Sequence, residues 1–596
     1  MKTPDTNFKK YWLKESYKIN WLKKPKNTID LIGSNVKWYK DGLVNAFYSC
    51  IESKISAHDN KICINYYDKN NNLYKYTLKE MSDYVKKFSY EINSRSKKKI
   101  KNIIIYGSAS IETAIAMFAC SQLGIHFSVI FQDLSFDAVI LRAKLLQADF
   151  IISRCTDKKF YSEILKSKMF RRKNIIFFHK DERLDISKIY KLDLNYLKNS
   201  KNKINLVKKL RPNSDFFSLF TSGSTGQPKG ITHSLGNYLV YANHTCRNKF
   251  GMKKNSIILT ASDAGWINGH TYALFGPLSI GSSTVILERP AMLLDEDFLN
   301  KVISECKISI LYLPVTLIRM MRSVFTKKPK KKYIKTLGSM GEPLAADVGK
   351  WFAKYFCLHN KAIINTYFQT ETGGIISSPN YRQDSKISPH GSVGSTNNKF
   401  LKIIIDKNDN NQFKIVNHWP GLMKNILNGK KIFNLYFDKN GYFKLFDTGK
   451  KIKNNFYVYG RIDDVLNIRG HRIGSGEIEA VVLSINDIKE ASVIDTEDLI
   501  TGKSITLFIS LKKLSSKKSV IKDKINKKII NLFGKFAVPE KIIFVKDLPK
   551  TKSGKILRRL LRNIYLGKKT DSYGDLSTIL NYSVITDIVK SVEEER

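Results

Sequence analysis

The sequence predicts an α/β protein with a large N-terminal domain of mixed, mostly parallel sheets and helices, a small antiparallel β subdomain and a small α+β C-terminal domain. Length is the first observation, because 596 residues exceed what one hydrophobic core normally serves. The second is an alternation of strand-like and helix-like segments between residues 98 and 153, which is typical of crossover connections and a parallel sheet. The third is a change after about residue 390 to shorter apolar segments between Asn, Asp and Gly turns.

The first sheet is predicted from apolar runs and the helical segments between them. Residues 102–107, "NIIIYG", have the pattern of a buried strand, and residues 110–124 that of a helix ending at Gly124. The same argument predicts a helix at 135–148 and further strands, which are 126–131, 149–153, 174–179 and 216–220. The alternating part therefore predicts a parallel sheet covered by helices.

The second half of the chain predicts two smaller units. Residues 390–462 contain four segments that we expect to form antiparallel strands, namely "LKIIID", "KIFNLYF", "GYFKLF" and "FYVYG". Residues 463–596 again mix strands and helices, with a helical segment at 519–534 and a tail from about 569. We therefore place the domain boundary after residue 462, so that residues 1–462 form the N-terminal domain.

Composition limits the class of protein. Apolar residues make up 42% of the chain, enough for a folded core, and no apolar run approaches the roughly 20 residues that span a bilayer. The N-terminal "MKTPDTNFKKYWLKE" has no apolar signal core. The seven cysteines are scattered and never in C-x-x-C spacing, which fits a reducing compartment without a zinc site. We therefore expect a soluble, unexported protein of the cytoplasm.

The formal net charge of +48 raises the alternative of a nucleic-acid-binding protein. The lysines, however, are spread along the whole chain, with short runs such as "TKKPKKK" but no basic arm. Lys, Asn and Ile are abundant together, so a general compositional bias explains the charge more simply. A basic protein with a degenerate enzyme fold stays open as an alternative function.

The segment "TSGSTGQPKG", Thr221 to Gly230, directly follows the apolar "FFSLF". Its glycines and hydroxyl residues disfavour regular structure, so it should be a loop leaving a buried strand. Such a loop can turn backbone N–H groups and hydroxyls toward phosphate oxygens, and Lys229 adds a positive charge. A flexible surface linker is the ordinary alternative. A Walker loop is excluded, because Lys229 precedes the glycine.

Three further segments are hard to explain by the fold alone. "NTYFQTETGG", residues 365–374, places Glu371 among hydroxyls before paired glycines. Asp447 and Arg461 lie in glycine-broken loops, as do Asp463 and Arg472. "LPKTKSGKILRRLLR", residues 548–562, presents Lys555 in a Ser-Gly turn. The ordinary alternatives are a capped turn, a solvated charge cluster and a solvated helix start.

In order and spacing these four segments resemble the motifs of the adenylate-forming superfamily, which contains acyl-CoA synthetases, luciferases and peptide-synthetase adenylation domains. "TSGSTGQPKG" is similar to its phosphate loop, "YFQTETGG" to its adenine-side motif, "YGRIDD" to its hinge and "PKTKSGK" to its catalytic-lysine loop. Residues 261–288 and "GSMGEPL" at 338–344 resemble the acetyl- and propionyl-CoA synthetase branch, as do Trp12, Trp21 and "YGDLST". The likeness runs from about residue 10 to 590.

The resemblance implies an AMP-forming ligase that uses ATP, coenzyme A and Mg²⁺. Its motifs map onto the phosphate contacts Thr221, Ser222, Gly223, Ser224, Thr225, Gly226 and Lys229. They map the adenine site onto Gly341, Glu342, Pro343, Asn365, Thr366, Tyr367, Phe368 and Gln369, with Tyr367 stacking on the base. Thr370 would contact the α-phosphate, Glu371 would bind Mg²⁺, Asp447 and Arg461 would bind the ribose, and Arg472 would approach the phosphates.

The C-terminal domain carries the catalytic lysine in this resemblance. Lys555 would bridge the carboxylate and the α-phosphate, and its acetylation by a regulator would silence the enzyme. The domain would be mobile and would rotate about Asp463 after adenylation, with Gly470 lining the thiol tunnel. Arg154, Lys158 and Lys159 are candidates for the nucleotide end of coenzyme A.

The acid is predicted from the positions that line the acyl pocket in the resemblance, which are Trp266, Ile267, Asn268, Met340 and Phe368. Acetate-specific relatives have a second Trp where this chain has Phe368, so the pocket should be wider, whereas Ile267 and Met340 fill space. We expect a carboxylate of two to four carbons, propionate slightly ahead of acetate. Asn268 could serve a hydroxy- or keto-acid or a wall hydrogen bond, and acetoacetate, acrylate or a branched acid are rival substrates.

Overall fold

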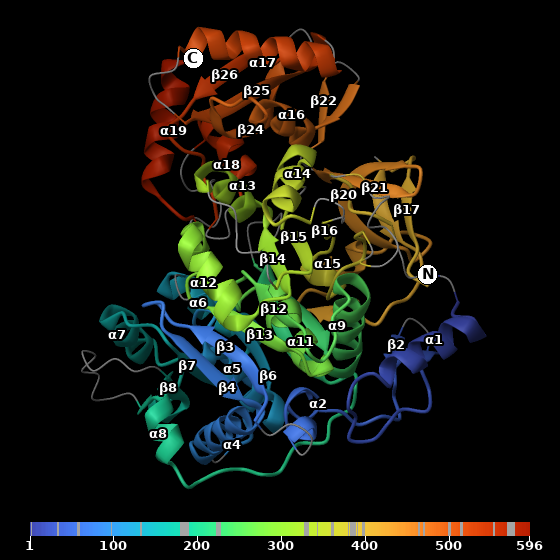
Figure 1. Ribbon diagram of the computed structural model, residues 1–596, viewed down its shortest axis with the longest axis vertical. Helices are drawn as coiled ribbons and strands as arrows, with labels where there is room; N and C mark the ends of the chain where they lie inside the picture. The colour runs from blue at the N-terminus through green and yellow to red at the C-terminus, as the bar shows by residue number, and fades with distance from the viewer. Residues whose placement is uncertain are drawn as a thin grey trace.

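The structure is a computed structural model that describes residues 1–596. The exceptions are residues 2, 33–34, 56–59, 97, 132–133, 179–189, 222–227, 327–332, 343, 359–362, 380, 382–388, 390, 396–399, 410, 463–464, 469–470, 499–501, 513–516, 534, 552–554, 569–578 and 596. Figure 1 shows two large sheets with helices in the lower part of the molecule and the C-terminal elements at the top.

The first large sheet has eight strands in the order β19-β11-β10-β6-β5-β7-β8-β9. Six of them pair in parallel, namely β5 (Asn102–Tyr106), β6 (His126–Ile130), β7 (Phe150–Ser153), β8 (Ile175–Phe178), β9 (Tyr190–Leu192) and β10 (Asp215–Thr221). Two strands at one edge are antiparallel, β11 (Lys229–Ser234) and β19 (Asn425–Ile426). Helices on this sheet include α4 (Leu78–Ser94), α5 (Ile111–Leu123), α6 (Phe136–Leu146), α7 (Lys158–Lys166) and α8 (Leu194–Asn199). The predicted strand and helix segments of this sheet are confirmed, and Gly124 ends α5 with φ of 68°.

The second large sheet has seven strands in the order β16-β15-β14-β12-β13-β3-β4. They are β3 (Ile62–Tyr67), β4 (Leu73–Thr77), β12 (Ile257–Thr260), β13 (Ser283–Leu287), β14 (Ile310–Pro314), β15 (Thr336–Met340) and β16 (Ile364–Asn365), and all pairs but β3–β4 are parallel. Its helices include α9 (Leu235–Phe250), α12 (Glu296–Cys306), α13 (Val315–Val324) and α14 (Ala346–Tyr355). The carboxyl ends of β15 and β16 lead directly into the "GEP" and "TYFQTETGG" motifs, which is where parallel sheets place their ligands.

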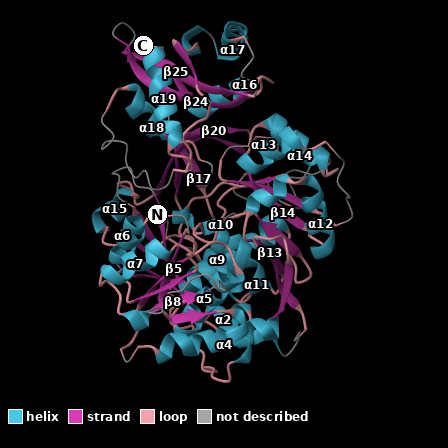
Figure 2. Ribbon diagram, turned by 90° about the vertical axis from the view of Figure 1, so that its left-hand side faces the viewer, coloured by secondary structure: helices cyan, strands magenta, loops and turns pink. Residues whose placement is uncertain are grey.

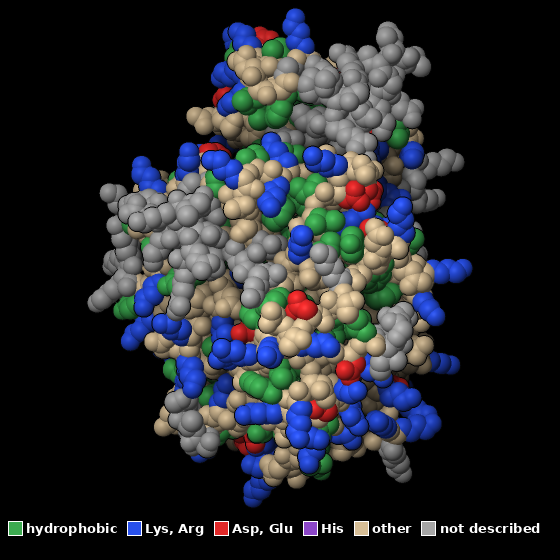
Figure 3. All heavy atoms as spheres, turned by 90° about the vertical axis from the view of Figure 1, so that its right-hand side faces the viewer, with side chains coloured by type: hydrophobic (Ala, Val, Ile, Leu, Met, Phe, Trp, Pro, Cys, Tyr) green, Lys and Arg blue, Asp and Glu red, His purple; other side chains and the backbone are tan. Residues whose placement is uncertain are grey.

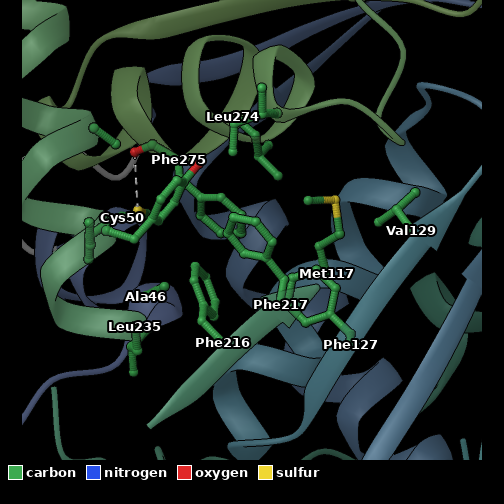
Figure 4. Close-up of a cluster of buried hydrophobic side chains, with 14 of the residues drawn as sticks. Ala46, Cys50, Met117, Phe127, Val129, Phe216, Phe217, Leu235, Leu274 and Phe275 are labelled. Atoms are coloured by element: carbon green, nitrogen blue, oxygen red, sulfur yellow. Dashed lines mark hydrogen bonds between the residues drawn. The ribbon is translucent and has the colours of Figure 1, made fainter. Parts of the chain in front are cut away.

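The main core lies between the two sheets (Figure 4). Phe127 of β6 and Phe216 and Phe217 of β10 face Met117 of α5 and Phe275 of the π-helix η3 (Thr271–Phe275). Short helices flank η3, namely α10 (Ile267–His270) and α11 (Gly276–Ile280). A π-helix inside a helical segment is rare and is found mostly at functional sites. The helix α10 directly before it carries Ile267 and Asn268 of the predicted acyl pocket.

The N-terminal segment packs on the same domain through α1 (Thr6–Ser16), β1 (Ile29–Ile32), β2 (Asn35–Trp38), α2 (Ala46–Cys50) and the 3₁₀ turn η1 (Glu52–Lys54). Trp12 is fully buried between Trp38, Tyr241 and His244. Glu15 accepts a hydrogen bond from His244 Nδ1 at 2.8 Å and is paired with Arg247, both on α9. These contacts fix α1 on the large domain.

The small antiparallel sheet is present in the order β17-β18-β20-β21. Its strands are β17 (Ile403–Asp406), β18 (Gln412–Ile415), β20 (Phe443–Ile452) and β21 (Asn455–Arg461). The prediction of a strand at "KIFNLYF" is wrong, because this segment forms the helix α15 (Lys430–Leu435). Its apolar residues Ile432, Phe433 and Tyr436 follow helical rather than alternating spacing.

The C-terminal domain is the predicted mixture of strands and helices (Figure 2). Its strands are β22 (Val465–Ile468), β23 (His471–Gly474), β24 (Ile488–Asp498), β25 (Gly502–Leu511) and β26 (Lys541–Phe544). Its helices are α16 (Ser475–Leu483), α17 (Lys518–Phe533), α18 (Arg558–Tyr565) and α19 (Ser583–Glu594). Two apolar clusters of its own stabilise it, one around Ile525 and one around Leu561.

Basic side chains are common on the surface of the protein. On the face in Figure 3, Lys and Arg side chains are scattered from top to bottom. All seven cysteines are free thiols, and six of them are buried. Within the described part of the chain, no helix is long and apolar enough to cross a membrane.

Candidate functional site

The predicted phosphate loop joins β10 and β11. Thr221, the last residue of β10, pairs with Lys229, the first residue of β11, so the loop is the turn of an antiparallel hairpin. The five central loop residues Ser222, Gly223, Ser224, Thr225 and Gly226 lie outside the described residues. The Lys229 ammonium lies 5.9 Å from the centre of the Tyr436 ring, close enough for a cation–π contact.

The TETGG segment forms a tight turn beside this hairpin. Thr370 to Thr372 form a 3₁₀ turn (η5), and the Thr370 carbonyl lies 2.7 Å from Nε2 of the fully buried His233 of β11. Burial lowers the His233 pKa to about 4, so the ring is neutral at pH 7 and its Nε2–H can donate to this carbonyl. The Glu371 carbonyl accepts from the Met423 N–H at 2.8 Å. The turn is thereby fixed against the phosphate hairpin.

Glu371 contacts Tyr436, a residue that the sequence analysis did not predict for the site. Its Oε1 accepts a 2.7 Å hydrogen bond from the Tyr436 hydroxyl at the end of α15. This contact occupies one carboxylate oxygen and fixes the rotation of the group. No hydrogen bond to the other oxygen, Oε2, comes from the part of the chain that the structure describes.

Asp447 of β20 is the centre of a buried polar network. Its Oδ2 accepts a 2.7 Å hydrogen bond from the Tyr367 hydroxyl and a second one from the Gln369 amide. Its Oδ1 lies 3.5 Å from Nη1 of Arg461, the residue opposite it on β21. Nη1 of Arg461 also donates to the Leu445 carbonyl at 3.1 Å, and so does Nε2 of Gln369 at 2.6 Å. The four predicted residues Tyr367, Gln369, Asp447 and Arg461 therefore meet in one place.

The charge of Lys555, in the C-terminal domain, acts on this network. Burial raises the pKa of Asp447 above its ordinary value, and the positive charges of Arg461 and Lys555 both act against that rise. Lys555 is itself solvent-exposed, on a turn in which Thr551 N–H donates to the Lys555 carbonyl at 2.8 Å. The structure thus brings the lysine of one domain within electrostatic range of a carboxylate of the other.

The lysine loop is anchored within the C-terminal domain. Arg558, three residues after Lys555, forms a two-pronged pair with Glu479 of α16, with Nε to Oε1 at 2.9 Å. Glu479 Oε1 also accepts from the Val493 N–H at 2.9 Å. Of the other predicted residues here, Asp463 and Gly470 lie outside the described residues, and Arg472 is described only through its place in β23, opposite Asn467.

The predicted adenine-side residues follow β15 and β16. Asn365 Nδ2 donates to the Ser392 carbonyl at 2.9 Å, and Thr366 Oγ1 donates to the Ser339 carbonyl at 2.8 Å. Gly341 has φ of 92° and no atom within 4 Å of where a side chain would start. Glu342 is paired with Arg319, and Pro343 lies outside the described residues.

Tyr367 makes contacts that the sequence did not predict. Its ring is buried, with its centre 5.8 Å from that of Phe413, and its hydroxyl is used by Asp447. Stacking on adenine stays a prediction.

The predicted acyl-pocket residues lie around Phe368. Phe368 packs against the apolar cluster of Ile267 and also against that of Met340, and its ring centre lies 5.7 Å from that of Tyr272 in η3. Trp266 is half-buried, 4.8 Å from the Phe131 ring. Oδ1 of Asn268 is buried and has no hydrogen-bond partner among the described residues. Among the described residues predicted for the pocket, Ile267, Met340 and Phe368 are apolar, and Asn268 offers an unpaired acceptor.

Arg154 does not have the exposed position expected for a residue that contacts coenzyme A. It is 4% exposed, lies 3.3 Å from both Glu112 and Glu288, and donates to Ser108 Oγ at 2.9 Å. Removing its charge from these carboxylates would leave them buried and unpaired. We therefore assign Arg154 a structural role at the junction of the two sheets, and Lys158 and Lys159 remain exposed.

Comparison with known protein families decides the class. The description "AMP-binding enzyme" matches residues 51–421, more than half of the chain, and "AMP-binding enzyme C-terminal domain" matches residues 477–555. The chain belongs to the AMP-binding enzyme family. The predicted resemblance to the adenylate-forming acyl-CoA synthetases is thereby confirmed.

Curated relatives of this AMP-binding enzyme match over nearly its full length. An acetyl-coenzyme A synthetase of Bartonella quintana (strain Toulouse) is 31% identical over 97% of this chain and 93% of its own, and one of Agrobacterium fabrum is 29% identical over the same shares. Among solved structures, an acetoacetyl-CoA synthetase from Streptomyces lividans superposes with a TM-score of 0.83 at 15% identity, over 99% of this chain and 93% of that one. An anthranilate CoA ligase in complex with anthranoyl-AMP superposes with a TM-score of 0.73 at 18% identity, over 87% and 97%. These structures confirm the fold class.

Two contacts of this AMP-binding enzyme were missed by sequence reasoning. His233 lies in "GITHS", directly after the phosphate loop. A histidine this close to the loop could have been predicted to lie near the site, where it contacts the Thr370 carbonyl. Tyr436 lies in the segment misread as a strand, where helical spacing of its apolar residues was the only signal. Neither residue lies within a motif that carried the resemblance.

Proposed function

We propose that the protein is an AMP-forming ligase that joins a carboxylate of two to four carbons to coenzyme A, propionate slightly ahead of acetate, using ATP. The observation that carries this proposal is the buried network in which Asp447 meets Tyr367, Gln369 and Arg461. The charge of Lys555 from the C-terminal domain also acts on Asp447. Activation of an acid by ATP requires cations and preorganised donors beside the phosphate at which the acid attacks. The acetyl-coenzyme A synthetase relatives support the same reaction class.

The first step would be attack of the carboxylate on the α-phosphate of ATP, giving acyl-adenylate and pyrophosphate. Negative charge moves on the phosphates during this step, so preorganised donors and cations should carry it rather than a protein nucleophile. The phosphate hairpin with Lys229 would hold the β- and γ-phosphates, and Thr370 the α-phosphate. Lys555 would neutralise charge between the carboxylate and the α-phosphate.

Asp447 would accept hydrogen bonds from the ribose hydroxyls through Oδ1, because its Oδ2 already accepts hydrogen bonds from Tyr367 and Gln369. Arg461 would hold the same sugar from the opposite strand. In the second step the thiol of coenzyme A would displace AMP from the adenylate. We propose that the C-terminal domain, residues 463–596, turns about Asp463 between the steps and that Gly470 then lines the thiol path.

The residues present fit a Mg²⁺ ion carried by ATP. Magnesium usually keeps several waters and takes one or two carboxylates beside substrate phosphates, and Glu371 offers one free oxygen. Among the described residues no group of three or more His, Cys, Asp or Glu could hold a metal by itself. When bound, the ion would neutralise phosphate charge, and Glu371 would orient it on the phosphate side.

The choice of acid rests on Phe368 and its neighbours. A phenyl ring leaves more room than an indole, whereas Ile267 and Met340 keep the pocket short. One methylene in an apolar pocket discriminates by only about 1 to 3 kcal/mol, so a neighbouring chain length should also be accepted. The free Oδ1 of Asn268 is the one observation in favour of a substrate with a donor group, such as a hydroxy acid.

Pyrophosphate release with a series of carboxylates from acetate to hexanoate, with and without coenzyme A, tests the proposal. We expect release with short acids only, and acyl-CoA only when coenzyme A is present. Release with no acid would refute the proposal. Release without turnover to a thioester would mean an adenylate with another acceptor, and salt-sensitive oligonucleotide binding without pyrophosphate release would favour the nucleic-acid alternative.

A further inference from the structure

We infer that Tyr436 and Phe446 form an aromatic bridge that positions Glu371 and Arg461 relative to each other. The inference rests on the proposed function, in which Glu371 is on the metal side of the nucleotide and Arg461 is on the ribose side. Neither aromatic residue needs to touch the reacting atoms. Both act as positioning residues for groups that do.

Tyr436 is the half of the bridge on the metal side. It is 5% exposed, and its hydroxyl donates to Glu371 Oε1 at 2.7 Å. With one oxygen held, the second oxygen of Glu371 points in a fixed direction.

Phe446 is the half of the bridge on the ribose side, and its backbone is unusual. It has φ of 54°, in the left-handed region that bulky residues rarely adopt. Its ring meets the Tyr436 ring edge-to-face with centres 5.2 Å apart. The Arg461 guanidinium lies 5.8 Å from the centre of the same ring, within range of a cation–π contact.

The left-handed backbone has a direct consequence for the site. Along a regular strand successive residues face opposite sides of the sheet. At Phe446 this alternation is interrupted, and both the Leu445 carbonyl and the Asp447 carboxylate accept hydrogen bonds from the Gln369 amide. Arg461 reaches the same two groups. A strained residue that persists beside such a network indicates that its conformation serves the site.

Tyr436 and Phe446 therefore connect two site residues, Glu371 and Arg461, that come from different parts of the chain. Glu371 belongs to the turn after β16, and Arg461 ends β21. The two rings, 5.2 Å apart, span the gap between them. The Lys229 ammonium also lies 5.9 Å from the centre of the Tyr436 ring. Loss of the Tyr436 hydroxyl should disturb mainly Glu371, and loss of the Phe446 ring should disturb mainly Arg461.

The test uses the full-length protein and measures binding by calorimetry without carboxylate or coenzyme A, so that no turnover occurs. ATP is titrated with and without Mg²⁺, and AMP is titrated alone. Tyr436→Phe removes only the hydroxyl, and we expect roughly tenfold weaker binding of Mg²⁺-ATP with AMP binding unchanged, since hydrogen bonds to charged groups are the strong ones. Phe446→Gly removes the ring but allows the left-handed backbone, and we expect roughly fivefold weaker AMP binding.

Matched controls come from the same subdomain. Tyr442→Phe removes a hydroxyl, and Phe437→Leu removes a ring that packs on Phe433 and Phe443 instead, so both should bind like wild type. Both Phe446→Gly and Phe446→Ala lose the ring contacts, but only glycine relieves the left-handed strain, so Phe446→Gly should melt at a higher temperature than Phe446→Ala.

A double variant, Tyr436→Phe with Phe446→Gly, completes the cycle, and non-additive losses are expected because the two rings touch. The inference is overturned if wild type binds Mg²⁺-ATP and AMP while Tyr436→Phe and Phe446→Gly match the controls. It is also overturned if each variant weakens the binding of Mg²⁺-ATP and of AMP equally, because that is the pattern of general destabilisation. Failure of wild type to bind ATP or to release pyrophosphate would instead refute the proposed function.

Discussion

Asp447→Asn should weaken ATP binding while leaving the fold intact. Asp447 is buried, its Oδ2 takes hydrogen bonds from Tyr367 and Gln369, and its Oδ1 faces Arg461 at 3.5 Å. An asparagine keeps the shape and can still accept from Tyr367 and Gln369 through one oxygen. Its NH₂ group would then take the place of Oδ1, so that a donor faces Arg461 and the ribose. One charged hydrogen bond to the sugar is lost.

A charged hydrogen bond contributes about 1.5 to 3 kcal/mol, so the KM for ATP should rise roughly 10- to 150-fold. ATP–pyrophosphate exchange at several ATP concentrations measures this, with saturating acid. The maximal rate should change much less, because in the proposed function Asp447 would hold the sugar rather than the transferred group. Asp409→Asn is the matched control, since this exposed carboxylate pairs with Lys414 on the same subdomain. An unchanged KM for ATP in Asp447→Asn would refute the reasoning.

Three further predictions concern the catalytic lysine, the acyl pocket and a buried ion pair of the N-terminal helix. Lys555→Ala should lose adenylation by 100-fold or more, as removal of a transition-state charge partner does, yet keep thioester formation from supplied acyl-adenylate; equal loss of both half-reactions would contradict its role. Phe368→Trp should shift the ratio of kcat/KM for propionate over acetate toward acetate by about 10-fold, and an unchanged ratio would remove Phe368 from the pocket. Burial raises the pKa of Glu15, but the His244 hydrogen bond and the Arg247 charge outweigh it and lower the pKa to about 2. Its stabilising effect, roughly 3 kcal/mol, is therefore fully present above pH 4.5 and lost as the pH falls through 2, so the difference in melting temperature between wild type and Glu15→Gln should be largest at pH 7, about half as large near pH 3 and absent only below pH 2.

Local sequence patterns were sufficient for much of the fold. "NIIIYG" became β5 because an uninterrupted apolar run suits a strand buried on both faces, and Gly124 ended α5 because glycine accepts the left-handed conformation. "KIFNLYF" was misread because a short apolar run has nearly the same composition in a helix and in a strand. Its packing on neighbouring strands, including the stacked rings of Tyr436 and Phe443, decided for the helix.

The motif residues of the site could be found because they are contiguous and chemically unusual. Tyr436 could not, because its partner Glu371 is 65 residues away and no local pattern marks the pair. Arg154 was a candidate for coenzyme A only because it follows the strand after which the resembling enzymes carry arginines. Burial between Glu112 and Glu288 gives it another role.

The sequence by itself determined which residue types are present and where the chain turns, since glycine, proline and apolar spacing act over a few residues. The tertiary structure alone decided which charges and hydroxyls meet, because hydrogen bonds and Coulomb forces depend on distances that no local rule sets. The approach of Lys555 to Asp447, and of Tyr436 to Glu371, belongs to this second kind.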